Sequence, residues 1–371
     1  MAHTPVHTDI DPLSAASDGA GRYAHVVDYL LSAPWAITPE KLRAIASVVV
    51  HRAYRGTLAP EAIEAAREQR RPTGILYATA EGFIPAAAIE AAGGRPPGDA
   101  RNITAILPVM GTILPRVSSM DESSGMFSLA RFRRDFNALV ADPAISGIVL
   151  DFDTPGGSVS LVQETAAEIY AARDRKPIGA VADPLSASAG LWLFTQATPG
   201  LTYATPSGLI GSVGVISAHQ DISRAMDELG VTTSLITSQG APHKAEGNPY
   251  EPLSDEARAE MQRMVDSYHG DFRAAVARGR GVSEAHVDTR FGGGRVLRAR
   301  EAVAAGMADH VGTLEDAIRA VMAQATSGGA GAARAGAPRS EHTEPAQDEP
   351  VPVDWTAVGA LVAARLAHEE G

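Results

Sequence analysis

Cysteine is absent from this sequence of 371 residues. Its absence excludes disulfides, thiol catalysis and cysteine-based metal sites, and it fits a reducing compartment. Long hydrophobic runs are missing too, since no stretch of about 18 apolar residues occurs that could span a membrane. The first 20 residues have neither the basic nor the apolar region of a secretory signal. We therefore expect a soluble protein of the cytoplasm with no membrane partner.

Positive charge is scarce. Lysine and arginine number 32 against 44 aspartates and glutamates, which gives a formal net charge of −12. A general nucleic-acid binder needs a basic surface, so we expect no nucleic-acid partner. Arg131, Arg133 and Arg134 form a local basic spot. We interpret this spot as a solvated helix face rather than as a surface for a partner.

The chain is long enough for one large domain with appendages. Within its N-terminal part, Thr38-Pro39-Glu40 has the form of a helix start, because a capping residue precedes a proline at the first helical position. The predicted regions are a flexible tail at 1–20, a helical region at 21–100, an α/β domain at 101–325, a disordered linker at 326–352 and an amphipathic helix at 353–371.

Short apolar runs alternate with helical patterns from residue 103 onward. The expected strands are 103–111, 147–153, 177–183, 200–204, 212–217 and 231–237. The expected helices are 128–142, 160–174, 188–197, 221–230 and 254–279. Ser160 and Gln163 stand at the spacing of a capping box at the start of the second helix. This alternation predicts an α/β fold with a parallel sheet and helices over both faces.

A glycine pair follows the apolar strand 147–153, in the run Asp153-Thr-Pro-Gly-Gly-Ser158. Gly156 and Gly157 can turn backbone N–H groups toward a ligand oxygen, and the following helix adds positive potential. These features favour an oxyanion hole, while a plain tight turn is the alternative. A phosphate-binding loop is weakly supported, because the sequence has neither established glycine-rich phosphate motif here.

A second strand-to-helix junction carries Ser186-Ala-Ser188-Ala-Gly190. A serine at a helix start is usually only an N-cap. The small neighbours of Ser188, however, leave its hydroxyl open to attack a carbonyl, and adjacent N–H groups can stabilise an oxyanion.

A nucleophilic serine needs a general base. His219 or His243 could serve, with Asp183 or Asp221 to orient the imidazole. Lysine is the other option, and residues 103–325 contain only Lys176 and Lys244. A buried lysine can act as a base, whereas arginine cannot near neutral pH.

Together these motifs resemble the signal peptide peptidase A family, whose members have the ClpP/crotonase fold. The resemblance covers residues 103–323 and implies repeated ββα and βα units around a parallel sheet. The octapeptide at 243–250 and the helical leader are similar to the phage prohead protease branch of that family. The motifs, in the order of the family, are Thr154-Pro-Gly-Gly-Ser158, Ser188-Ala-Gly190, Gly211-Ser-Val-Gly-Val215, the Lys244 loop and the run 302–309.

The resemblance implies a role for each of these residues. Ser188 would be the nucleophile and Lys244 the general base. Gly157 and Ala189 would offer N–H groups to the oxyanion, with Gly156 shaping the loop, and Ser212 would orient the lysine. The threonine that usually precedes the Gly-Ser-Val-Gly run is Ile210 here, which puts the hydrogen bonding of the lysine in doubt.

The expected function is that of a serine endopeptidase of the phage prohead. Its substrates would be scaffold, capsid or portal proteins, and its own tails. The family implies a homo-oligomer in which serine and lysine can come from adjoining subunits, and it implies no metal and no cofactor. Membrane members of the family carry an anchor that is not found here. The alternatives are a non-catalytic scaffold or minor capsid component and a crotonase-like acyl-CoA enzyme.

Overall fold

The fold was analysed in a computed structural model, which describes residues 34–39, 41–42, 74–94, 96, 102–117 and 125–328. The chain divides into two compact units, Met1–Ala330 and Gly331–Gly371. The tail at 1–20, the C-terminal helix at 353–371 and almost all of the linker at 326–352 lie outside the described residues. Everything below concerns the first unit.

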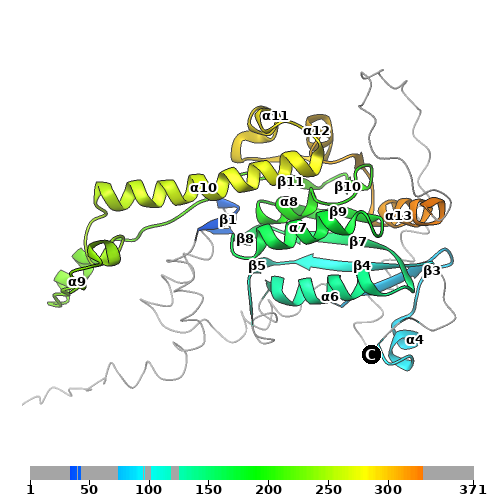
Figure 1. Cartoon of the computed structure of the whole chain (residues 1–371), viewed down its shortest axis with the longest axis horizontal. Helices are drawn as coiled ribbons and strands as arrows, with labels where there is room; N and C mark the ends of the chain where they lie inside the picture. The colour runs from blue at the N-terminus through cyan, green and yellow to red at the C-terminus, as the bar shows by residue number, and fades with distance from the viewer. Residues whose placement is uncertain are drawn as a thin grey trace, which may run out of the picture. The chain divides into compact units, whose positions relative to one another are not determined.

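A mixed β-sheet forms the centre of this unit (Figure 1). Three long strands run parallel in its middle: β4 (Ile103–Met110), β7 (Ile145–Thr154) and β9 (Ile178–Ala187). β9 is followed on its free side by two short parallel partners, β10 (Thr202–Ala204) and β11 (Leu209–Gly211). The remaining strands lie further out: β2 (Leu76–Thr79), β3 (Gly82–Phe83), β12 (Val296–Arg298) and β13 (His310–Val311).

Helices cover both faces of this sheet, as the sequence predicts. One face carries α6 (Leu129–Ala141), α7 (Val162–Ala172) and α8 (Ala189–Phe194), whose apolar side chains join the larger core. α13 (Leu314–Gly328) packs on the other face through a smaller core. The other helices are α4 (Ala86–Ala91), α9 (Ser223–Glu228), α10 (Asp255–Arg280), α11 (Glu284–Arg290) and α12 (Ala299–Ala305). In the described ranges, no helix is long and apolar enough to cross a membrane.

A second, smaller sheet lies at the carboxyl end of the central strands. Its strand order is β1 (Trp35–Ile37), β8 (Gly156–Ser158), β5 (Thr112–Leu114) and β6 (Met126–Ser128). β8 and β5 continue the chain just after β7 and β4, so this sheet sits where the parallel strands end. The carboxyl ends of parallel strands are the usual place for a ligand site in α/β folds.

α10 is anchored to the core only by its C-terminal half. Trp192 of α8 stacks on Phe272 of α10 with ring centroids 4.7 Å apart and planes 5° from parallel. Before Phe272, only Ala257 of this helix is buried. Figure 1 shows the N-terminal half running away from the sheet toward α9. We call residues 221–268, which contain α9 and this half of α10, the arm.

Several predicted elements are corrected by the structure. Residues 212–217 are not a strand but a loop with one isolated bridge at Ile216, and 231–237 is an unpaired segment on the arm. Of the first run only Ile216 pairs, with Trp35 of β1, and residues 231–237 have no neighbouring strand among the described residues. The capping box of Ser160 and Gln163 is also wrong, because α7 begins after Leu161, which has a φ of 66° and caps through no side chain.

The region predicted to be helical before residue 100 is mixed. A helical turn does begin at Pro39, and the Lys41 N–H contacts the Thr38 hydroxyl at 3.4 Å. The described residues also form β1 and the β2–β3 hairpin, which joins the edge of the central sheet beside β4. These strands are two to four residues long, too short to show a periodic pattern in the sequence. Residues 21–33 and 43–73 of the region predicted to be helical lie outside the described residues.

A buried ion pair holds the end of α10 to the C-terminal part of the unit. The guanidinium of Arg280 donates to Asp309 at 2.7 Å, and the two side chains are 3% and 6% exposed. Burial alone would raise the pKa of Asp309, but hydrogen bonds and charge from Arg280, with bonds from Thr202, outweigh it and lower that pKa to about 2. Asp309 therefore stabilises the fold in its ionised form.

Breaking this pair should destabilise the protein strongly. Arg280→Ala or Asp309→Asn leaves a buried group without its partner, which costs about 3–5 kcal/mol of unfolding free energy. In the wild type, ionised Asp309 contributes about 2.5 kcal/mol to the free energy of unfolding. This contribution is complete above pH of about 4 and is lost as the pH falls toward 2. Denaturant unfolding at several pH values measures both effects. Arg263→Ala removes an exposed pair with Glu260 and serves as the control, with no change expected.

Candidate active site

Ser188 lies at the junction between β9 and α8. β9 ends at Ala187 and α8 begins at Ala189, so Ser188 takes the N-cap position. Its side chain makes no capping hydrogen bond, although capping is the usual role of a serine there. Its hydroxyl points instead toward the carbonyl oxygen of Gly214, 3.5 Å away. Capping therefore does not account for this serine.

The backbone of Ser188 is held in a conformation that favours glycine. Its φ is 54° and its ψ is −116°, a combination that costs other residues roughly 1–3 kcal/mol. Two main-chain hydrogen bonds fix it: Ser188 N–H donates to Gly211 at 2.8 Å, and Trp192 N–H donates to Ser188 at 3.0 Å. Backbone strain of this kind occurs mainly where function requires a particular side-chain direction.

Gly156 packs directly against Ser188, and Gly157 packs against Ile113 of β5. Gly156 has a φ of +93°, and a Cβ on it would lie 2.9 Å from the Cβ of Ser188. A Cβ on Gly157 would lie 1.9 Å from the carbonyl oxygen of Ile113, so only glycine fits there. The Thr154 hydroxyl fixes the loop, since it donates to Gly111 at 2.6 Å and accepts from Gly156 N–H at 3.1 Å.

The predicted oxyanion residues are the chain neighbours of Ser188 and Gly156, which contact each other. Ala189 is fully buried at the first position of α8, and the first N–H groups of a helix have no partner within it. Gly157 is in β8, between Ala36 of β1 and Ile113 of β5. The amide of Gly156 is already bound to Thr154, which suits the shaping role that the sequence analysis gave it.

Ser212 lies on the neighbouring strand end. It follows β11, whose Gly211 pairs with Ala187, and its N–H donates to Arg295 at 2.8 Å. Its φ of 61° makes it a second non-glycine residue with positive φ at this place. Ile210 is fully buried opposite Ser186, so an apolar side chain occupies the position where the family has threonine.

Lys244 lies on the arm, in the 3-10 helix Pro242–Ala245, and its side chain is exposed. Among the described residues, its ammonium has no hydrogen-bond partner, and the Ser188 hydroxyl is paired with Gly214 only. Figure 1 shows the elements on either side of this helix, α9 and the start of α10, away from the central sheet. The structure of a single chain therefore does not join Ser188 to Lys244.

Lys176 is the other lysine of the predicted domain. Its ammonium donates to the Leu139 carbonyl at 2.8 Å and to the Asp142 carbonyl, and burial lowers its pKa. Lys176 precedes β9 and Ser188 follows β9, so the whole strand separates them. A strand of ten residues spans roughly 33 Å. Lys176 closes the C-terminal end of α6 and is too far from Ser188 to take its proton.

Neither histidine alternative is bonded to Ser188 in the described residues. His243 is exposed and paired with Glu246, which raises the pKa of its imidazole. His219 follows the Ile216 bridge and has a buried Nε2 without a hydrogen-bond partner in the described part of the chain. Of the proposed orienting acids, Asp221 accepts from Ser223 N–H at 2.9 Å.

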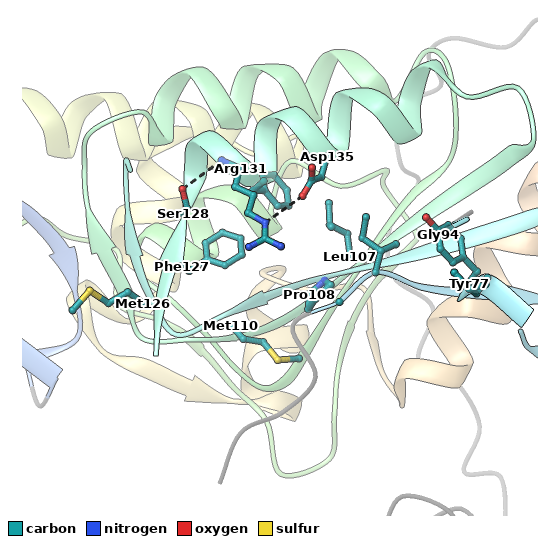
Figure 2. Close-up of a pocket in the computed structure, with 14 residues that line it drawn as sticks. Tyr77, Gly94, Leu107, Pro108, Met110, Met126, Phe127, Ser128, Arg131 and Asp135 are labelled. Atoms are coloured by element: carbon teal, nitrogen blue, oxygen red, sulfur yellow. Dashed lines mark hydrogen bonds and ion pairs between the residues drawn. The ribbon is translucent and has the colours of Figure 1, made fainter. Parts of the chain in front are cut away.

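The basic spot on α6 is neutralised by neighbouring acids, as a solvated helix face should be. Arg133 binds Glu168, Arg134 contacts Asp135 at 3.0 Å, and Arg131 lies 3.8 Å from Asp135. Figure 2 shows Arg131 and Asp135 beside a cavity of about 290 Å³ between α6 and β4. The apolar part of its lining includes Leu107, Pro108, Met110, Met126 and Phe127.

The sequence analysis missed three contributors to the site. Gly214 accepts from the Ser188 hydroxyl, Thr154 fixes the glycine loop, and β1 pairs with that loop. Thr154 was visible in the motif but had no assigned role. No sequence signal could place β1, because its partners are more than 100 residues away along the chain.

Comparison with known proteins identifies the domain around this site. Residues 171–327 match the model of peptidase family S49. The chain carries a peptidase S49 domain. The match includes Ser188 and Lys244, whereas the glycine loop precedes it. The resemblance to the signal peptide peptidase A family is confirmed, because the relatives include a putative signal peptide peptidase SppA of Enterococcus faecium, 28% identical over 215 residues, and a phage capsid assembly protease.

Three curated proteins are similar to this chain. The chain is 35% identical to capsid assembly protease C of Escherichia phage lambda over 218 residues, which are 58% of this chain and 48% of the relative. It is 34% identical to head-tail preconnector protein GP5 of Enterobacteria phage P21 over 238 residues, which are 63% of this chain and 46% of the relative. It is 28% identical to Protease 4 of Salmonella typhi over 214 residues, which are 57% of this chain and 32% of the relative. The chain thus spans about half or less of the length of these relatives.

Proposed function

We propose that this chain is a serine endopeptidase with Ser188 as its nucleophile and Lys244 as its general base. The observation that carries the proposal is the state of Ser188: a serine at a helix start that caps nothing, in a strained backbone conformation, against the glycine loop. The finer fold would be that of the ClpP/crotonase group, with the peptidase domain at 101–325. The S49 match supports the proposed fold and the proposed function, and the protease names of two relatives support the function.

Lys244 would act on Ser188 of a second copy. A lysine acts as a base where it is buried beside the nucleophile, and Lys244 is exposed in the single chain. A neighbouring copy would bury it and bring it to the serine. The arm has apolar surface to support such contact, since Leu229, Leu235 and Ile236 are 74%, 48% and 95% exposed. The active form would therefore be a homo-oligomer.

The reaction would follow the usual course of acyl transfer. Lys244 takes the proton of Ser188, whose oxygen attacks the peptide carbonyl carbon, while Ser212 orients the lysine. The N–H groups of Gly157 and Ala189 stabilise the oxyanion, and Gly156 shapes their loop. The protonated lysine then gives its proton to the leaving amine. Water hydrolyses the acyl-enzyme and returns the serine.

The substrates would be polypeptides of phage head assembly. The names of two relatives refer to capsid assembly and to the head-tail preconnector, which supports scaffold, capsid or portal proteins as substrates inside the prohead. Self-cleavage in the predicted linker at 326–352 would accompany these reactions, because exposed chain of that composition is readily cut.

Covalent labelling tests this function directly. A fluorophosphonate probe should modify the purified chain, and mass spectrometry should place the label on Ser188. The same preparation should shorten itself near residues 326–352 on storage. Ser188→Ala should abolish both labelling and shortening. Equal shortening of the Ser188→Ala variant would contradict the proposal.

A further inference from the structure

Residues 34–38, which we call the leader strand, lie extended between two parts of the candidate site (Figure 1). On one side β1 pairs antiparallel with β8, with Ala36 opposite Gly157. Thr38 N–H donates to Pro155 at 2.9 Å and Val159 N–H donates to Pro34 at 3.4 Å, which extends this ladder at both ends.

The other edge of the leader strand is bonded as well. Trp35 N–H donates to the Ile216 carbonyl at 2.7 Å, and Ile216 N–H donates to the Trp35 carbonyl at 2.8 Å. Main-chain groups are thus engaged on both edges, as in the middle strand of a three-stranded sheet. The walls of this groove are β8 and the loop that ends at Ile216.

Both walls take part in the chemistry proposed for Ser188. β8 carries Gly157, and the second wall contains Gly214, which accepts from the serine hydroxyl. Gly156 has no Cβ, and the space that a Cβ would take separates Ala36 from Ser188. This position lies 2.2 Å from the carbonyl oxygen of Ala36 and 2.9 Å from the Cβ of Ser188. The leader strand therefore presents a peptide carbonyl at the nucleophile.

Ser188 is shut off from solvent in this arrangement. Its exposed fraction is 0%, and that of Ala36 is also 0%. A substrate carbonyl has no room to approach the hydroxyl while Ala36 stays in place.

We propose that the leader strand is a tethered, substrate-like segment that fills a polypeptide-binding groove beside Ser188 and blocks Ser188 until it leaves. This proposal rests on the function proposed above. Pairing through main-chain groups on both edges requires only an extended backbone, which any unfolded polypeptide can adopt. The same walls accept an extended substrate once the leader strand has moved out.

The side chains of the leader strand indicate which substrates fit. Trp35 and Ile37 are each 1% exposed and pack with Leu114, while Ala36 points the other way into the main core. This alternation is that of any β-strand. The groove therefore selects extended segments with a small residue opposite Gly157 and large apolar residues on both sides of it.

A reversible disulfide lock tests the proposal. Trp35 and Ser158 are direct partners in the ladder, and they fall between its hydrogen-bonded pairs, where Cα atoms are about 4.5 Å apart and a disulfide can form. The chain has no cysteine of its own, so Trp35→Cys with Ser158→Cys creates a unique pair. The rate of Ser188 labelling by a fluorophosphonate probe is then measured in the oxidised and the reduced protein.

The oxidised protein should be labelled at least tenfold more slowly than the reduced protein. The single variants Trp35→Cys and Ser158→Cys are the controls and should show no dependence on the redox state. Equal labelling of the oxidised and reduced forms, with the disulfide verified by mass, would overturn the proposal and leave the peptidase assignment intact. Absence of Ser188 labelling in every form, wild type included, would overturn both.

A proline substitution gives a second measurement that needs no disulfide. Ala36→Pro removes an N–H group from the ladder and should release the leader strand, so labelling should be at least tenfold faster than in the wild type. Ala36→Gly keeps the N–H and should stay within about threefold of the wild type. If the proline variant is folded by circular dichroism and is labelled no faster, the leader strand does not block the site.

Discussion

Ser188→Ala, Lys244→Ala and Lys244→Arg are each expected to lower peptide hydrolysis by at least about a thousandfold, since the two groups act as a unit in one proton transfer. The arginine variant is informative because it keeps the positive charge of Lys244 but cannot accept a proton near neutral pH. The assay is turnover of an extended fluorogenic peptide at fixed pH.

Two neighbours supply matched controls for these variants. Ser186→Ala removes a buried hydroxyl two positions from the nucleophile, and the oxygen of Ser186 has no hydrogen-bond partner in the described residues. Lys176→Met removes the other lysine of the domain. Both should retain activity within about tenfold of the wild type, since neither group reaches the reacting atoms. A Lys244→Arg variant that keeps most of its activity would show that Lys244 is not the base.

Two inactive variants should restore activity when they are combined in one oligomer. If Lys244 serves Ser188 of another copy, Ser188→Ala and Lys244→Ala subunits mixed in equal amounts form about a quarter of their sites from two intact partners. Activity should then lie between about a quarter and a half of that of the wild type, although each variant alone is inactive, because selection for mixed oligomers raises the share of intact sites to a half in a dimer. Co-expression with two different affinity tags, followed by tandem purification, gives the mixed oligomer for the assay.

The opposite result is equally clear. If serine and lysine came from the same chain, every mixed site would lack one of the two groups, and the mixture would stay inactive. Activity that persists in Ser188→Ala would point to another nucleophile, whereas activity that persists in Lys244→Ala would point to another base. His219→Ala, tested in the same assay, would then identify it, because the buried Nε2 of His219 has no hydrogen-bond partner in the described residues.

Elements that bury many residues locally were predictable from the sequence. β7 and β9 contain the short apolar runs 147–153 and 177–183 between helical patterns, and α6 shows its buried face at helical spacing, so the sequence indicates all three. The glycine loop and Ser188 were also found, because a strand-to-helix junction with small residues leaves a visible motif.

Features that depend on distant pairing were not predictable. β1 is a strand only because β8 and Ile216 form hydrogen bonds with its two edges. The sequence Trp35–Ile37 does not indicate those partners. Residues 231–237 have the composition of a strand, yet no neighbouring strand reaches them on the arm. The exposure of Lys244 could not be foreseen either, since its position depends on how the arm leaves the core.

The arm also bears on when proteolysis can begin. α10 has 26 residues, a length of roughly 39 Å, and only its last turns are fixed to the body. With Lys244, the proposed general base, near the free end of such an element, a solitary molecule would have no complete catalytic pair. The rate at low concentration would then rise with the square of the protein concentration. Digestion would stay negligible while copies are dilute and start once they are crowded inside one closed shell.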